Sequence, residues 1–258
     1  MEYFIIGGIA LLTSILTFFS GFGVGTILTP VFVVFFPIDI AIAMTAIVHF
    51  LNNLFKFGLT YKDINKSVLF RFGLPAIPFA ILGAWLLVSL STQNTQLAKF
   101  TFLSINCEVY LIQLIVGLLM LFFAIAELYP SFKKDTIKKQ HLFLGGIISG
   151  FFGGLTGHQG ALRTMFLIKS GLVKEAFIAT GIAIACFVDV SRLAVYFGKV
   201  NQINIKDNIG IITTATLCAF LGAYFGKKLL KKITINTIQY MVSALIGVIS
   251  ILLIFGII

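Results

Sequence analysis

Two residues of opposite charge lie three positions apart within an otherwise apolar stretch. The stretch reads FVDVSRLAVYF, and its charged members are Asp189 and Arg192. A charge at the centre of a membrane-spanning helix costs at least about 2.5 kcal/mol, so such a residue is usually kept for pairing or for function. Residues three apart share one helix face, so the two side chains can form a structural ion pair. In the functional interpretation, Asp189 holds an arginine in place or takes up a proton.

A second arginine, Arg163, follows the glycine-rich stretch GGLTGHQGALRTM at residues 153–165. Its guanidinium is a fixed cation with donors in a planar fork, which suits a sulfite, sulfonate or carboxylate group. The alternatives are that Arg163 extends to a membrane interface or pairs with Asp189. Contact with an anion and a structural role both stay open.

Three polar residues, His49, Asn52 and Asn53, interrupt the apolar run AIVHFLNNLFKF. His49 and Asn52 are three apart, as are Asn53 and Lys56, so each pair shares a helix face. An imidazole titrates near neutral pH and could carry a coupling proton. Hydrogen bonding between helices is the simpler explanation. We assign these three polar residues and Asp189 to coupling or to structure.

Glycine-rich stretches occur twice, as SGFGVGTILTP at residues 20–30 and as GGLTGHQGALRTM at 153–165. Glycine permits a left-handed backbone and close approach of a ligand. A helix that starts after such a turn presents free N–H groups to an anion. Tight helix packing is the alternative for the glycines, and an exposed loop position is the alternative for His158. The predicted substrate-binding residues are Gly21, Gly23, Gly25, Thr29, Gly157, His158, Gln159, Gly160, Arg163, Thr164 and Arg192.

The composition places these residues in a membrane protein. Of the 258 residues, 59% are hydrophobic and 11% are charged, whereas a soluble domain averages about 45–50% and about 25%. The apolar runs are continuous rather than alternating, which favours helices over a β-barrel. The N-terminal stretch lacks a basic region and a small-residue cleavage pattern, so we expect a retained first helix.

Ten apolar segments can be recognised, since a spanning helix needs about 20 apolar residues. The second segment of each set of five is short and flanked by glycines, which makes it a candidate for a broken or re-entrant helix. The segments lie near residues 3–19, 22–37, 40–58, 67–90 and 108–130, and near 141–156, 159–172, 175–198, 207–228 and 234–257.

The two sets of segments look like copies of one another. A shift of 135 residues aligns AIAMTAIV at 41–48 with AFIATGIA at 176–183, and it matches Gly25 with Gly160. Chance similarity between helices rich in alanine and glycine is the alternative. A register kept across four helices favours internal duplication, which is common in transporters.

Basic residues predict how the two halves are oriented. If residues 131–140 face the cytoplasm, most loop lysines also face inward and both termini face outward. Each half has an odd number of segments, so the second half is inverted. We predict an all-α, inverted-repeat bundle with repeats at 1–130 and 141–258 and a cytoplasmic linker at 131–140. The inward-facing residues are Lys62, Lys66, Arg71, Lys133, Lys134, Lys138, Lys139, Lys169, Lys174, Lys227, Lys228, Lys231 and Lys232, and the outward-facing ones are Lys99, Lys199 and Lys206.

The paired glycine-rich stretches and the duplicated layout resemble the TauE/SafE family of membrane permeases, known as sulfite exporters. In that family both halves carry a glycine-rich motif that ends in small residues and commonly a proline. The resemblance covers nearly the whole chain, although Met165 stands where the first half has Pro30. It implies a permease of the bacterial cytoplasmic membrane for sulfite, an organosulfonate or a related sulfur-containing or carboxylate anion.

Other function classes lack their motifs. No P-loop, HExxH, GxSxG or Cys/His metal cluster occurs, which argues against an ATP-driven pump and the common membrane hydrolases. We expect no cofactor and no metal. We also expect no nucleic-acid partner, because the net charge of +10 is explained by membrane orientation. The expected partners are a small anion, the lipid bilayer, and coupling protons or cations. The alternatives are a passive anion channel, a membrane enzyme, or a partner subunit without transport activity.

The expected mechanism is alternating access. The anion would bind near the bilayer midplane between the two glycine-rich turns, held by backbone amides, Arg163 and Arg192. Rocking of the two halves would expose the anion to either side. Export from a negative interior gains about 2.3 kcal/mol per charge per 100 mV, whereas uptake needs co-transport, for which His49 and Asp189 are the candidates.

Overall fold

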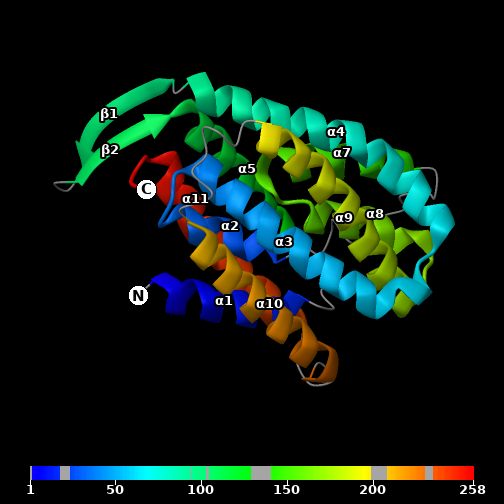
Figure 1. Ribbon diagram of the computed structural model, residues 1–258. Coiled ribbons are helices and arrows are strands. Elements are labelled where there is room, and N and C mark those ends of the chain that lie inside the picture. Colours follow the sequence, from blue (N-terminus) through cyan, green and yellow to red (C-terminus); the bar gives the residue numbers. More distant parts are fainter. Residues whose placement is uncertain are drawn as a thin grey trace.

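The computed structural model describes residues 2–17, 24–93, 95–102, 105–128, 141–198, 208–229 and 235–258. Within these ranges the chain forms a helical bundle with a β-hairpin at one end, and both termini lie at the hairpin end (Figure 1). The helices are α1 (Glu2–Thr17), α2 (Gly25–Val33), α3 (Ile38–Thr60), α4 (Lys66–Gln93), α5 (Leu111–Leu128), α7 (Leu142–Thr156), α8 (Gly160–Leu167), α9 (Lys174–Gly198), α10 (Ile209–Leu229) and α11 (Ile235–Ile254), with single 3₁₀ turns η1 (Tyr61–Asp63) and η3 (Ile168–Ser170).

Each of the ten predicted apolar segments contains one of these helices. By length and composition, four of the helical stretches in the described part of the chain can cross a membrane: Ile38–Asp63, Lys66–Gln93, Lys174–Gly198 and Ile209–Gly226. Shorter apolar helices accompany them. Large apolar side chains such as Trp85, Phe122 and Leu217 are more than half exposed, as expected for a surface that faces lipid. The chain is therefore a multi-pass membrane protein.

Helices α2 and α8 are too short to span a bilayer. They have 9 and 8 residues, or about 14 and 12 Å at 1.5 Å per residue, against about 30 Å of hydrocarbon. Helix α8 turns back along α7, because its Phe166 packs against Gly145 near the start of α7. The residues after α2 line a hollow together with Ile257 and Ile258, at the end that holds both termini. A hairpin that returns to its own side leaves the predicted sidedness of every later loop unchanged.

Two parallel helix pairs approach so closely that their backbones touch. In the α4–α7 seam, a Cβ on Gly154 would lie 2.1 Å from the carbonyl oxygen of Ala80. In the α1–α10 seam, a Cβ on Gly222 would lie 2.3 Å from the carbonyl oxygen of Leu11. Small residues allow such approach in membranes, where close packing replaces the hydrophobic effect as the force between helices.

The closest helix pairs join one helix of the first predicted repeat to one helix of the second. Helix α1 lies along α10 as α7 lies along α4, while α3 packs against α9 and α5 against α11. The α3–α9 pair is antiparallel, since the Asn65 N–H donates to Thr180 Oγ1 (2.9 Å) and His49 lies beside Asp189. An inverted duplication would produce this pattern, with each seam joining one helix from each predicted repeat.

The β-hairpin is a feature that hydropathy did not predict. Strands β1 (Gln96–Phe102) and β2 (Ile105–Tyr110) pair antiparallel, with Lys99 opposite Glu108. The apolar segment predicted at 108–130 therefore begins only at Leu111. The reason is local, because polar and apolar residues alternate before this point, as a half-exposed strand requires.

Candidate functional site

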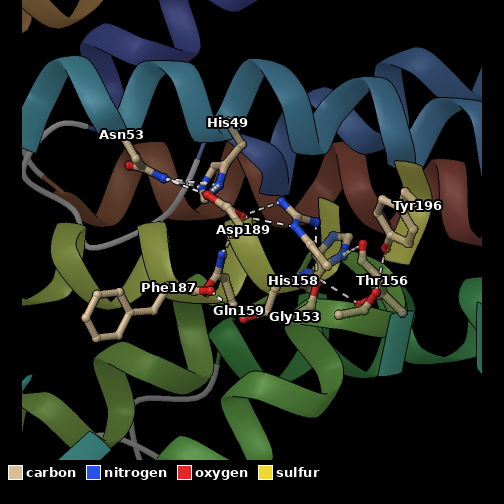
Figure 2. Close-up of polar contacts among 12 residues, drawn as sticks. His49, Asn53, Gly153, Thr156, His158, Gln159, Phe187, Asp189 and Tyr196 are labelled. Carbon is tan, nitrogen blue, oxygen red and sulfur yellow. Dashed lines mark hydrogen bonds and ion pairs between the residues drawn. The ribbon is translucent and has the colours of Figure 1, made fainter. Parts of the chain in front are cut away.

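A group of polar residues lies buried where α3 crosses α9 and the α7–α8 turn. This group, here called the polar cluster, is at most 5% exposed at every side chain. Figure 2 shows His49 and Asn53 on α3 facing Asp189 on α9, with Gln159 approaching from the turn. Sequence spacing predicted the residues but not their meeting. The polar cluster consists of His49, Asn53, Gln159, Asp189 and Arg192.

Asp189 is the centre of the polar cluster. Its Oδ1 accepts hydrogen bonds from Nε (3.0 Å) and Nη2 (2.8 Å) of Arg192, which confirms the predicted pair. Gln159 Nε2 donates to the same oxygen at 3.1 Å. Oδ2 faces His49 Nδ1 at 2.6 Å. A buried carboxylate needs this full set of donors, because a charge without partners in an apolar interior is very costly.

A small cavity lies beside the polar cluster. It encloses about 30 Å³, which is room for one or two water molecules. Two cationic side chains line it, Lys56 of α3 and Arg163 of α8, with the polar side chains of Thr17, Asn53 and Thr164. None of the described residues that line it is acidic. We call this space the cationic cavity.

Lys56 is the site residue that sequence reasoning missed. It is 3% exposed and lies seven positions after His49, on the same face of α3. Asn52 supports it. With the Asn52 amide oriented to satisfy both of its ends, Oδ1 accepts from Lys56 Nζ (3.2 Å) and Nδ2 donates to the carbonyl oxygen of Ala219 (3.2 Å). A lysine in an apolar run that also carries His49 and Asn53 was the available signal.

Two side chains connect the polar cluster to the cationic cavity. Asn53 lines the cavity, and its Nδ2 lies 3.3 Å from Asp189 Oδ2. Gln159 accepts from Arg163 Nη1 at 3.5 Å through Oε1 and donates to Asp189 through Nε2. A change of charge in the polar cluster therefore affects the cationic cavity through Asn53 and through Gln159.

The described glycines of the two glycine-rich stretches lie near the polar cluster rather than in the lining of the cavity. Gly157 ends α7 with φ +80°, and a Cβ there would lie 3.0 Å from Arg192 Nη1. Gly25 starts α2 with its backbone against the His49 ring. Helix α8 starts at Gly160, and none of these three glycines lines the cavity. The other two predicted glycines, Gly21 and Gly23, lie outside the described residues.

Several predicted polar residues near the turns are buried. His158 is 2% exposed, so the exposed-loop alternative is wrong, and its ring stacks on Phe123. His158 Nε2 and the hydroxyls of Thr17 and Thr29 have no hydrogen-bond partner among the described residues. Buried polar atoms normally have one, so these atoms mark places where water or a ligand can bind.

The lining of the cationic cavity suits an anion. Lys56, Arg163 and three neutral polar side chains line one space, which provides charge-assisted donors for an oxyanion. The described residues contain no group of three or more His, Cys, Asp or Glu side chains that could hold a metal ion.

Comparison with known proteins identifies the family. A family model described as sulfite exporter TauE/SafE matches residues 6–253, which is nearly the entire chain. No curated protein and no solved structure matches. The family is one of membrane transporters, in agreement with the apolar helices and with the resemblance of the glycine-rich stretches. The chain belongs to the TauE/SafE family.

Proposed function

We propose that the protein is a secondary transporter that carries a small sulfur-containing or carboxylate anion across the bacterial cytoplasmic membrane by alternating access. The observation that carries the proposal is the cationic cavity, where Lys56 and Arg163 face one enclosed space. Both side chains offer N–H donors to this space, and donors of this kind form charge-assisted hydrogen bonds with an oxyanion.

The seams suggest which parts move. In the proposed movement, α4 would stay with α7 and α1 with α10, because the backbones of each pair are in close contact. One body would contain α1, α2, α3 and α10, and the other α4, α7, α8 and α9, with movement at the α3–α9 contact. The cationic cavity lies at this contact, because Lys56 comes from α3 and Arg163 from α8. Rocking of the two bodies would open it to either side.

Loop charge supports an orientation with both termini outside. The loop after α3 carries Lys62, and the start of α4 carries Lys66 and Arg71, all at the end opposite the termini. The positive-inside rule puts that end in the cytoplasm. The predicted linker 131–140 and its lysines lie outside the described residues.

Loss of Arg163 tests the site. In purified protein, Arg163→Ala is expected to weaken binding of thiosulfate or sulfoacetate by about 10-fold to 100-fold, because a hydrogen bond to a charged group contributes about 1.5–3 kcal/mol. Isothermal calorimetry would measure the dissociation constants.

Lys62→Ala is the matched control, since Lys62 is exposed and lies away from the cavity. Each variant should first be shown to elute as a folded species in detergent. Unchanged binding in Arg163→Ala would contradict the proposed site, and binding of neither anion by the unmodified protein would contradict the substrate class.

A further inference from the structure

The contact between His49 and Asp189 crosses from one proposed body to the other. His49 belongs to α3 and Asp189 to α9, and the two side chains meet at 2.6 Å with exposures of 1% and 0%. The other partners of Asp189 come from α9 itself, the α7–α8 turn and Asn53. His49 is therefore the one titratable group that the first body contributes to this carboxylate among the described residues.

The partners of the His49 ring assign its neutral tautomer. Nδ1 carries a proton and donates to Asp189 Oδ2, since an ionised carboxylate can only accept. Nε2 is then a bare acceptor, and the Asn53 amide nitrogen lies 3.2 Å from it. The same amide nitrogen lies 3.1 Å from Nδ1 and 3.3 Å from Asp189 Oδ2. In this orientation, the Asn53 amide presents its NH₂ group to the His49 ring.

A second proton on His49 would reverse this arrangement. When Nε2 also carries a proton, neither ring nitrogen can accept from the Asn53 NH₂ group, and turning the amide gives the new N–H an acceptor, Oδ1. Asn53 lines the cationic cavity, so this rotation changes the groups that face a bound anion. Protonation also adds a positive charge next to the cavity, which strengthens binding of an anion there.

We propose that His49 takes up the proton that accompanies the anion, so that transport is proton–anion symport. The orientation of the Asn53 amide would link the protonation of His49 to the cationic cavity. The inference rests on the proposed anion transport. Linkage requires the effect to be reciprocal, so the bound anion also favours protonated His49. The proton enters from water on one side as an N–H bond forms at Nε2, and it returns to water on the other side after the α3–α9 contact has opened.

The charged groups around His49 are compatible with a single added proton. Asp189 and Arg192 face it from α9, and Arg163 acts on it from α8. From α2 the contact is the Gly25 backbone, which does not titrate. Lys56 lies two turns further along α3.

The test uses the unmodified protein in liposomes loaded with a pH-sensitive dye, with the membrane potential clamped at zero. Thiosulfate and sulfoacetate are the probes, because neither takes up a proton near neutral pH. Uptake of a probe is expected to acidify the lumen, and an inwardly directed proton gradient should accumulate the probe about tenfold per pH unit for one proton per anion.

His49→Gln separates coupling from transport. Glutamine can donate to Asp189 as the neutral ring does but cannot take a second proton, so accumulation driven by the proton gradient should be lost. Exchange of external for internal anion should persist, because exchange needs only the movement of the anion-loaded carrier and no net uptake or release of a proton. The matched control is His141→Gln, since His141 precedes α7 at a half-buried position away from the cluster.

The outcomes distinguish the two proposals. Transport of a probe without luminal acidification in the unmodified protein would overturn the proton coupling and leave the anion transport standing. Proton-driven accumulation that survives in His49→Gln would overturn the role of His49. If the unmodified protein moves neither probe, the proposed function fails and the coupling fails with it. The unmodified-protein measurement does not depend on the folding of any variant.

Discussion

Replacing Asp189 with alanine is expected to lower the free energy of unfolding by about 3–5 kcal/mol, the usual cost of removing one partner of a buried ion pair. The carboxylate accepts hydrogen bonds from Arg192, Gln159 and Asn53 and faces His49, all in the interior of the bundle. Without it, Arg192 is left as a buried cation whose other contacts are to neutral groups, such as the carbonyl oxygen of Gly153 at 3.4 Å. Unfolding in detergent, followed by circular dichroism against denaturant, would measure the loss.

A double variant shows whether charge or shape causes this loss. Asp189→Leu combined with Arg192→Met removes both charges, and such replacements are often neutral or stabilising. We expect the double variant to recover most of the stability lost in Asp189→Ala while failing to transport. If Asp189→Ala unfolds at the same denaturant concentration as the unmodified protein, the ion pair is not a structural element of the bundle.

The position of the helices was predictable because lipid imposes a simple rule. Every backbone group must be paired inside a helix, so long apolar runs translate directly into helices such as α3 and α9. The Asp189–Arg192 pair was predictable for a similar reason, since a spacing of three residues fixes the helix face. The β-hairpin was not, because it lies outside the apolar runs and its alternation covers only a few residues.

Contacts between distant parts of the chain could not be predicted from the sequence. The bond between His49 and Asp189 spans 140 residues, and no helical period relates them. The inverted repeat did not help, because a shift of 135 residues maps Asp189 to Leu54 and Arg192 to Phe57. The charges thus break the symmetry of the backbone, and only the packing of α3 on α9 brings them together. The cationic cavity was missed for the same reason.

This asymmetry suggests that different residues of the bundle provide the framework and the ionisable groups. The symmetry-related features, such as the two seams and the two short re-entrant helices, are made of glycine and apolar residues and provide the framework. The features found only once are ionisable side chains, namely Lys56 and His49 on α3 and Arg163 and Asp189 on the other side. In the proposed mechanism both are needed, because the framework would rock between two states while the asymmetric set of polar residues would select the anion.

Replacing Gly154 with alanine tests the α4–α7 seam and is expected to cost about 3 kcal/mol, the upper end for forcing an extra methyl group into a packed interior. The added Cβ would lie 2.1 Å from the carbonyl oxygen of Ala80 and 2.9 Å from the backbone nitrogen of Ala84, so two helix backbones must separate. Gly222→Ala should cost a similar amount in the α1–α10 seam, where the Cβ would lie 2.3 Å from the carbonyl oxygen of Leu11. Thermal unfolding of the purified variants would rank them.

Gly8→Ala is the control for this ranking. Gly8 is an exposed helical position with no other atom within 4 Å of an added Cβ, so alanine should stabilise the protein by about 0.5–1 kcal/mol through its higher helix propensity. The contrast matters because all three changes add the same methyl group within a helix. If Gly154→Ala behaves like Gly8→Ala, then α4 and α7 are not held in backbone contact, and the two bodies proposed to rock against each other are not rigid.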